Sequence, residues 1–302
     1  MRPPWPYRLP RRTGGDGVAR VRKGVLTRLV HAAGHPVVVH CWQPGDKRVL
    51  LRAAGAAERP PTRQALELAI ERMRFAIGVD ENLQEFYDAF RSDPLVGPAV
   101  RHHPWRRPRR RPWPWEALAW AVTEQLIQAR RAAEIQRRIV RRWGAKLAPP
   151  CAGAWRGPGP LRDVPTAEVI AGRAPAELAA MDLAPARSLA LTKCAREVAS
   201  GRADLTRREA DARLLRISEI GPWTVQCLGL FGRGEPDSLP AGDLAYVKLV
   251  GYLAGLRRRA TVEEVEEYFA PYAPFRALAG TFALGHWGKA MGAGPPTGPL
   301  GH

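Results

Sequence analysis

The spacing of apolar residues changes near residue 60, and this change constrains the fold more than any other feature. Before it, PVVVHCW and KRVLLRA flank the turn sequence Gln43-Pro44-Gly45-Asp46, which is typical of a β-hairpin. After it, Thr62 can cap a helix whose apolar residues are spaced by four, three and four: Leu66, Ile70, Met73 and Ile77. The sequence therefore predicts an α+β protein, with a small N-terminal β-sheet-containing domain over residues 17–78 and a mostly α-helical region over 79–290.

Three segments interrupt this pattern. Residues 1–16 are rich in Pro, Arg and Gly and predict a flexible basic arm, and the Gly/Pro-rich residues 291–302 predict a disordered tail. Residues 101–115, RHHPWRRPRRRPWPW, contain too many prolines for a regular helix. Their arginines and tryptophans fit a segment that follows nucleic-acid phosphates, but they equally fit a solvated charge run whose tryptophans pack under the next helix.

The charge balance points to a polyanionic partner. The chain carries 47 basic and 29 acidic residues, a net charge of +18, and all but six of the basic residues are arginine. A GC-rich coding bias inflates arginine, but it need not leave the charge unbalanced, so nucleic acid is the expected partner. With no apolar run near 18 residues and no signal-peptide core at the N-terminus, we expect a cytoplasmic protein with no membrane contact.

The four cysteines are scattered through the chain at positions 41, 151, 194 and 227. None lie close enough together for a zinc knuckle or an iron–sulfur ligand run, so we expect no iron–sulfur cluster. Four scattered cysteines in a chain of 302 residues also do not suggest a disulfide scaffold.

Further along, a helix is predicted over residues 114–144, with Gly144 as its stop, and shorter helices over 166–172, 176–181 and 185–200. The segment ISEIGPWTV then joins two helical patterns through a short turn, which predicts a helical hairpin over about 214–231. Gly221 permits a positive φ or a close backbone approach, and Pro222 suits the first helical turn. The unpaired amides that begin the second helix predict an anion site, for which DNA phosphate is the natural ligand.

One carboxylate, Asp243 in LPAGDLAYVK, lies between a Pro-Ala-Gly turn and an apolar run. An aspartate in this position is usually a helix cap, but it can also be a catalytic acid in a basic chain. Asp243 follows Thr224 by 19 residues, which leaves room for one helix and a loop.

Together, GPWTVQCLGLFG, PAGDLA, LAWAVTEQLIQARRAAEIQRRIVRRWG and FALGHWGKAMG resemble the helix-hairpin-helix/Gly-Pro-Asp superfamily of DNA glycosylases. The likeness is closest to the 3-methyladenine DNA glycosylase II (alkylbase glycosylase) type, and it covers roughly residues 80–290. It implies a base-excision repair enzyme that flips a damaged base out of double-stranded DNA and acts as a monomer. Asp243 would stabilise the oxocarbenium-like sugar and orient the attacking water.

The same resemblance assigns the reaction type. Bifunctional members carry a catalytic lysine two residues after the last hairpin glycine, where this chain has Trp223. It therefore implies a monofunctional enzyme without lyase activity, whose substrates are alkylated purines such as 3-methyladenine and 7-methylguanine. Two alternatives stay open: a glycosylase for oxidised or deaminated bases, and a non-catalytic helix-hairpin-helix DNA-binding protein.

The resemblance also places the other site residues. Trp223, Trp287 and Tyr246 match base-pocket walls, although core packing is the usual role of such aromatics. Gln125 and Leu126 match the wedge that fills the gap left by the flipped base, unless they belong to an uninterrupted amphipathic helix.

Phosphate contacts are expected from Gly221, Trp223, Thr224 and Lys248. No cofactor is required, but a monovalent cation, Na⁺ or K⁺, would bind the backbone carbonyls of Leu215, Ile217 and Ile220. This hairpin departs from the usual pattern because Glu219 replaces its first glycine.

Overall fold

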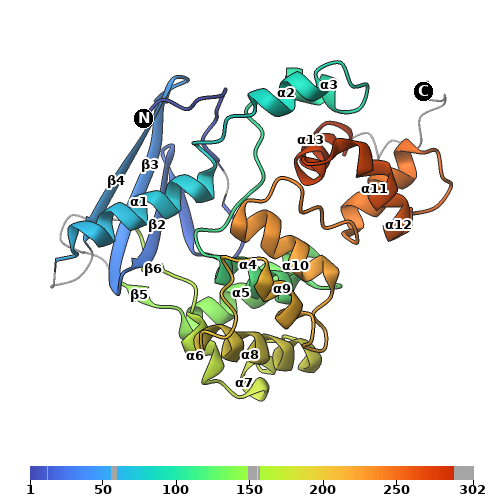
Figure 1. The fold of residues 1–302 in the computed structure, drawn as a ribbon. Coiled ribbons are helices and arrows are strands. Elements are labelled where there is room, and N and C mark those ends of the chain that lie inside the picture. Colours follow the sequence, from blue (N-terminus) through green and yellow to red (C-terminus); the bar gives the residue numbers. More distant parts are fainter. Residues whose placement is uncertain (12, 56–59, 149–154, 156, 289–302) are drawn as a thin grey trace.

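The computed structural model describes residues 1–11, 13–55, 60–148, 155 and 157–288. The predicted tail over 291–302 lies outside these residues. The N-terminal part is an antiparallel sheet in the order β1-β2-β3-β4, with α1 against it (Figure 1). Its elements are β1 (Ala19–Arg22), β2 (Val25–Ala32), β3 (His35–Gly45), β4 (Arg48–Gly55) and α1 (Arg63–Ile77). Thr62 caps α1 as predicted, because its hydroxyl accepts the amide of Ala65 at 3.2 Å.

Two predictions for this part are wrong. The hairpin turn lies at residues 46–47, because β3 continues through Gln43 to Gly45 across an irregularity in the register. The Gln43 side chain explains the extension, since it accepts the amide of Leu9 at 2.7 Å and donates to the carbonyl of Tyr7 at 3.1 Å. The predicted flexible arm is also packed: the Tyr7 ring is buried, and its hydroxyl donates to the carbonyl of Ile77.

The rest of the described chain is mainly helical. Its elements are α2 (Gln84–Phe90), α3 (Val96–His102), α4 (Pro114–Glu124), α5 (Ala129–Trp143), β5 (Lys146–Leu147), β6 (Leu161–Arg162), α6 (Ala167–Ala171), α7 (Pro175–Ala179), α8 (Pro185–Ala199), α9 (Glu209–Leu214), α10 (Pro222–Cys227), the π-helical segment η1 (Leu228–Arg233), α11 (Leu244–Leu253), α12 (Val262–Phe269), the 3₁₀ turn η2 (Ala270–Tyr272) and α13 (Arg276–Trp287). The predicted mostly helical architecture with a small N-terminal sheet is confirmed. Among the described residues, no helix is long and apolar enough to cross a membrane.

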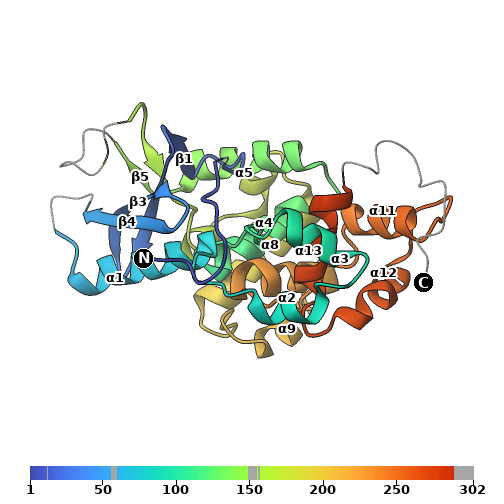
Figure 2. The same cartoon turned by 90° about the horizontal axis from the view of Figure 1, so that it is seen from above.

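The helices enclose two apolar cores, and Figure 1 shows the two groups of helices that form them. Figure 2, turned by 90°, shows the N-terminal sheet toward one end of the molecule and α11 and α12 at the other. The first core is built mainly from α4, α5, α6, α8 and α9. The second is built from α2, α3, α11, α12 and α13, and both cores include residues of η1. The region between α4 and α11 therefore lies where the two cores meet.

Several helix boundaries differ from their prediction. The helices predicted over 166–172 and 176–181 form over Ala167–Ala171 and Pro175–Ala179. The second hairpin helix, expected to run to about Phe231, changes from α to π geometry after Cys227 and ends at Arg233. The short strands β5 and β6 were not predicted. They pair with each other, and Leu161 packs with Trp155 against the sheet residue Leu29.

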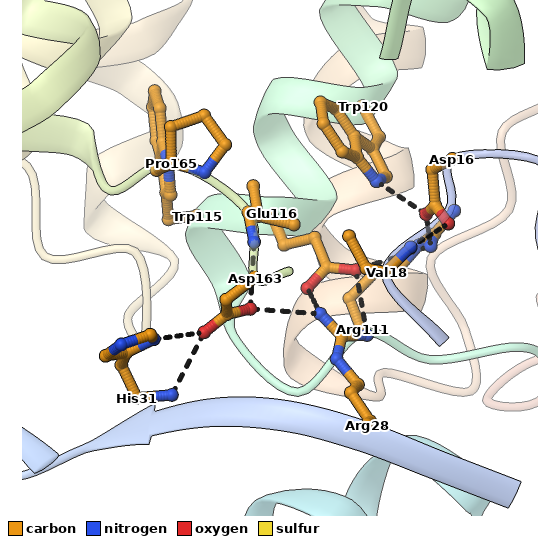
Figure 3. A network of polar contacts seen from close by, with 11 residues as sticks. Asp16, Val18, Arg28, His31, Arg111, Trp115, Glu116, Trp120, Asp163 and Pro165 are labelled. Carbon is orange, nitrogen blue, oxygen red and sulfur yellow. Dashed lines mark hydrogen bonds and ion pairs between the residues drawn. The ribbon is translucent and has the colours of Figure 1, made fainter. Parts of the chain in front are cut away.

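A buried group of charged residues joins the sheet to the helices (Figure 3). In this Arg28 network, the guanidinium of Arg28 contacts the carboxylates of Glu116 at 2.5 Å and Asp163 at 3.6 Å. Arg111 contacts Glu116 and Asp16, and the Trp120 ring N–H donates to Asp16 at 3.1 Å. Because these residues come from β2, α4 and three loops, the network fixes α4 against the sheet.

Candidate active site

Asp243 is the N-cap of α11. Its carboxylate Oδ1 accepts the amide of Ala245 at 2.8 Å, and its own amide donates to the carbonyl of Pro240. Asp243 is therefore a helix cap, one of the two roles considered from the sequence. The turn before Asp243 holds its side chain at the start of the helix. The Asp243 side chain is half-buried, and its Oδ2 makes no hydrogen bond among the described residues.

Between the two helical cores is a cavity of about 430 Å³, called the central cavity below. Asp243 does not line it, but the Asp243 charge acts on Tyr246 and Cys227, which do. Its wall combines apolar and aromatic side chains with arginines of the 101–115 segment and with Glu124, Cys227 and Thr281. The lining residues are Arg106, Arg107, Pro108, Arg109, Arg111, Ala117, Trp120, Ala121, Glu124, Cys227, Leu230, Phe231, Tyr246, Thr281, Leu284 and Gly285. A volume of this size suits a small, mostly apolar ligand.

Tyr246 is the predicted pocket residue that the structure brings to this cavity. Burial raises the pKa of its hydroxyl, and the negative charge of Asp243 adds to the effect. The ring fits because α13 has Gly280 at the contact, where a Cβ would come within 2.7 Å of the Tyr246 ring. Gly285 similarly leaves room for the Arg106 guanidinium, which donates to the Gly285 carbonyl at 3.1 Å.

The two predicted tryptophans lie elsewhere. The indole N–H of Trp287 donates to the carbonyl of Leu95 at 3.2 Å, and the ring packs against the second core, so Trp287 does not line the central cavity. Trp223 is half-buried beside the turn that carries Asp243: a Cβ on Gly242 would lie 3.9 Å from the Trp223 side chain. Trp223 therefore flanks the catalytic candidate rather than lining the central cavity.

Sequence reasoning missed Glu124, which ends α4 and lines the central cavity. Burial is the largest influence on its carboxyl and raises the pKa above the usual range, while a hydrogen bond from Gln136 partly offsets this. The signal was available, because Glu124 directly precedes the predicted wedge Gln125-Leu126 in VTEQLIQ. Cys227 lies across the same cavity, and burial followed by the charges of Glu124 and Asp243 raises the pKa of its thiol.

The wedge segment is a loop, so the uninterrupted-helix alternative is wrong. Helix α4 ends at Glu124, α5 begins at Ala129, and Leu126 between them has a positive φ of 54°. The Leu126 side chain is 98% exposed, which is unusual for a large apolar residue. A leucine held in a left-handed conformation and facing solvent is costly, and such strain is typical of functional loops.

Gln125 ties this loop to the hairpin. Its side-chain amide donates to the carbonyl of Glu219 at 2.7 Å and to the hydroxyl of Thr224 at 2.9 Å. On the other side, Arg187 donates to the Gln125 carbonyl at 2.6 Å. Gln125 therefore positions the exposed Leu126. This role differs from the predicted one, in which Gln125 enters the DNA together with Leu126.

The hairpin turn differs from its prediction. The positive φ of 73° falls on Glu219, whereas Gly221 is extended, with φ −110°, and a Cβ at that position would meet no atom within 4 Å. Thr224 is a poor phosphate ligand, because its amide donates to the Gly221 carbonyl and its buried hydroxyl faces Gln125. Lys248 is exposed on α11.

The carbonyls expected to hold a cation lie in this turn. That of Ile217 already accepts the amide of Ile220 at 3.0 Å, which leaves it one lone pair for a further partner. Among the residues that the structure describes, no group of three or more His, Cys, Asp or Glu side chains is arranged to hold a metal ion.

Most arginines of the 101–115 segment face inward, which neither interpretation of the segment anticipated. Arg107 and Arg110 pair with Glu81, and Arg111 belongs to the Arg28 network. The tryptophans are also engaged: Arg8 lies 3.3 Å from the centre of the Trp105 ring, and the Trp115 N–H donates to Pro165. Arg109 is exposed at the mouth of the central cavity, where contact with a polyanion stays a prediction.

Comparisons with known proteins agree with this geometry. No family model matches the chain. It is 25% identical to the DNA-3-methyladenine glycosylase of Bacillus subtilis over 272 residues, 87% of this chain and 86% of that protein. It is 26% identical to a Mycobacterium tuberculosis protein named "Probable bifunctional transcriptional activator/DNA repair enzyme AlkA", of whose length it spans about half.

Among solved structures, the fold is similar to that of a 3-methyladenine DNA glycosylase from Archaeoglobus fulgidus. The TM-score is 0.80 at 18% identity, and the match covers 96% of this chain and 98% of that one. The predicted resemblance to the helix-hairpin-helix DNA glycosylases is therefore confirmed, in sequence by the Bacillus relative and in fold by the Archaeoglobus structure.

Proposed function

We propose that this chain is a DNA base-excision repair enzyme, a monofunctional glycosylase that hydrolyses the N-glycosidic bond of alkylated purines, 3-methyladenine and 7-methylguanine foremost. The observation that carries the proposal is the position of Asp243, a capped carboxylate beside the central cavity. The relationship to a DNA-3-methyladenine glycosylase supports the substrate class. The net charge of +18 supports double-stranded DNA as the partner.

In the proposed mechanism, the damaged nucleotide leaves the stack and its base enters the central cavity, where Tyr246 forms one wall. As the C1′–N bond lengthens, positive charge builds on the deoxyribose. The Oδ2 atom of Asp243 faces this charge and stabilises it, and the same carboxylate orients the water that attacks C1′. A cationic alkylpurine leaves without further protonation, so one carboxylate suffices for this class of base.

The DNA contacts follow from the surrounding elements. Leu126 fills the gap that the flipped base leaves, which offsets an unstacking cost of a few kcal/mol. The amides of Gly221 and Trp223 and the ammonium of Lys248 face the phosphates. The carbonyls of Leu215, Ile217 and Ile220 would hold a monovalent cation, whose positive charge would strengthen the phosphate contact.

The absence of lyase activity follows from Trp223, which occupies the place where a bifunctional enzyme carries its lysine. An indole cannot form a Schiff base with C1′, so the strand stays intact after base release. We further propose that the protein acts as a monomer in the cytoplasm.

Two other functions compete with this one. A glycosylase for oxidised or deaminated bases would share Asp243 and differ in the cavity wall. A non-catalytic DNA-binding protein would gain nothing from Asp243, because a carboxylate facing DNA repels phosphate. The placement of that carboxylate beside a cavity therefore favours an enzyme.

The test is single-turnover release of 7-methylguanine and 3-methyladenine from methylated duplex DNA. We expect release by the native protein and a loss of about 10³-fold in Asp243→Asn, the size typical of removing one transition-state contact. Asp46→Asn, in the exposed β3–β4 turn, is the matched control and should keep the native rate. DNA binding without base release would refute the enzyme, and a borohydride-trapped protein–DNA adduct would refute the monofunctional assignment.

A further inference from the structure

Glu124 is a second carboxylate at the central cavity, and the mechanism proposed above does not use it. It stands at the C-terminal end of α4, one residue before the wedge loop, and lines the cavity together with Cys227 and Tyr246. Asp243 is close enough for its charge to act on the Glu124 carboxyl. Glu124 lines the cavity that would hold the departing base, whereas Asp243, at the start of α11, lies outside the lining and acts on Glu124 and Tyr246 through its charge.

The Glu124 side chain is held in place by a buried amide. Gln136 on α5 is 3% exposed, and its Nε2 donates to Glu124 Oε1 at 3.0 Å and to the Thr123 hydroxyl at 2.9 Å. The Thr123 hydroxyl donates in turn to the carbonyl of Trp120 at 2.9 Å. Since Oε1 is taken by Gln136, Oε2 is the oxygen left to face the cavity. A chain of three buried hydrogen bonds that fixes one carboxyl oxygen is a positioning device.

The surroundings of Glu124 favour its neutral form. Burial from water is the largest influence, and the negative charges of Asp16, from the N-terminal segment, and Asp243 act in the same direction. Arg111 is the opposing cation, but its guanidinium already contacts Asp16 and Glu116. Cys227, on α10, faces the same space with a thiol whose raised pKa keeps it uncharged. No ion pair to Glu124 is present among the described residues.

We propose that Glu124 is a second catalytic residue, a general acid that protonates the departing base. In this step the Oε2–H proton passes to a ring nitrogen of the purine, while the C1′–N9 electron pair moves to the base. The base leaves neutral, the sugar cation is stabilised by Asp243, and water adds at C1′. The proton released by that water passes to solvent, and solvent reprotonates Glu124, so the cycle is balanced.

This role sets the substrate class, and it rests on the proposed glycosylase function. A cationic alkylpurine has no need of a proton, but an uncharged purine lesion is a poor leaving group without one. Glu124 therefore extends the enzyme to uncharged purine lesions with a free ring nitrogen, of which deaminated adenine is the simplest. The excision of 7-methylguanine should depend on Glu124 only through the cavity wall, and therefore less strongly than the excision of an uncharged base.

The experiment compares two duplexes, one with a single inosine and one with a single 7-methylguanine, under single-turnover conditions. In Glu124→Gln, which keeps the size and the Gln136 contact, we expect base release from inosine to fall about 100-fold. Release of 7-methylguanine should fall by a much smaller factor, because Glu124 contributes only to the cavity wall for this base, and Glu71→Gln, an exposed control on α1, should change neither rate.

The pH dependence separates a proton donor from a residue that only shapes the cavity. Because the neutral acid is the active form, the native rate on inosine should fall as pH rises through the raised pKa of Glu124. That falling limb should vanish in Glu124→Gln. Equal losses on both duplexes, a larger loss on 7-methylguanine, or an unchanged limb would overturn the assignment.

The two proposals fail in different ways. Native protein that releases 7-methylguanine but no hypoxanthine would refute the role of Glu124 and leave the proposed function standing. Native protein that releases neither base would refute the proposed function itself.

Discussion

Helix α4 carries a glutamate near each end, and the two have opposite surroundings. Glu116 is 1% exposed and lies in the first turn, between the guanidinium groups of Arg28 and Arg111. Glu124 ends the helix beside the central cavity, with an amide as its hydrogen-bond partner and Asp243 as a charged neighbour. Glu116 and Glu124, eight positions apart on one helix, therefore have different electrostatic environments.

The difference follows from elementary electrostatics. At the N-terminal end, the helix dipole and two arginines both favour a negative charge, so Glu116 can be buried and ionised. At the C-terminal end, the dipole disfavours the carboxylate, and the charge of Arg111, which already contacts Asp16 and Glu116, does not outweigh burial and the negative charges of Asp16 and Asp243. The first environment holds the molecule together. The second raises the pKa of the carboxyl group, which favours the neutral form that can donate a proton.

The largest effect on stability is expected from breaking the ion pairs at the N-terminal end of α4. Arg28→Met keeps the aliphatic volume but leaves Asp163 and part of Glu116 buried without their cation. We expect a loss of about 3–4 kcal/mol in the free energy of unfolding, measured by urea denaturation. Arg63→Met, whose side chain is exposed on α1, is the matched control and should leave the free energy of unfolding close to the native value. A similar small loss in Arg28→Met would mean that the network contributes little.

A smaller effect is expected at Asp163. Burial alone would raise the pKa of this carboxyl, but the hydrogen bond from His31 and the charge of Arg28 outweigh it and hold the pKa below the usual range. Asp163→Asn should cost about 2 kcal/mol at pH 7, since the side chain still accepts hydrogen bonds but loses its charge.

The pH dependence at Asp163 has a definite sign. A lowered folded-state pKa contributes stability that is present above the unfolded value, near 3.9, and is lost as pH falls through the folded value. The difference in free energy of unfolding between the native protein and Asp163→Asn should therefore decrease below about pH 4. A gap that is constant from pH 7 to pH 3 would contradict this origin of the stability.

At the C-terminal end of α4, removing the charge of Glu124 should change the stability in the opposite direction. Glu124→Gln removes a carboxyl whose folded-state pKa is raised, and such a group contributes stability that is lost as pH rises through the folded value. At pH 7 the variant should therefore be more stable than the native protein, by about 1 kcal/mol, and the difference should shrink toward pH 4. Thermal unfolding at both pH values measures this, and a variant that is less stable at pH 7 would remove the contrast with Glu116.

The sequence predicted one end of α4 better than the other. Gln125 and Leu126 were found because VTEQLIQ resembles a family motif, but nothing local marks the helix break. The break depends on contacts from distant residues, Arg187 and Thr224, which hold Gln125. Similarly, Asp243 was found as a cap that follows a hairpin at a fixed distance, and that local signal survives in the structure.

Glu116 and Trp287 show why the remainder escaped prediction. The ion pairs of Glu116 join residues 88 positions apart in the sequence, and no local pattern reports such a pairing. Trp287 was expected in the pocket wall, yet the direction of its side chain is set by the carbonyl of Leu95, 192 positions away. Periodicity predicts which elements form, whereas the facing of each side chain depends on how distant elements meet.

The smallest effect is expected at Gln136, which contacts Glu124 but does not itself line the central cavity. Gln136→Met keeps a similar volume and removes the hydrogen bond that partly lowers the pKa of Glu124. The stability cost should be about 0.5–1 kcal/mol, because the Thr123 hydroxyl also loses a donor. With that bond gone, the pKa of Glu124 rises further, so the falling limb of the inosine rate should move to higher pH while 7-methylguanine release is unchanged. A shift of this limb to lower pH would mean that Gln136 stabilises the protonated form of Glu124, and it would contradict the proposed effect of this hydrogen bond on the pKa.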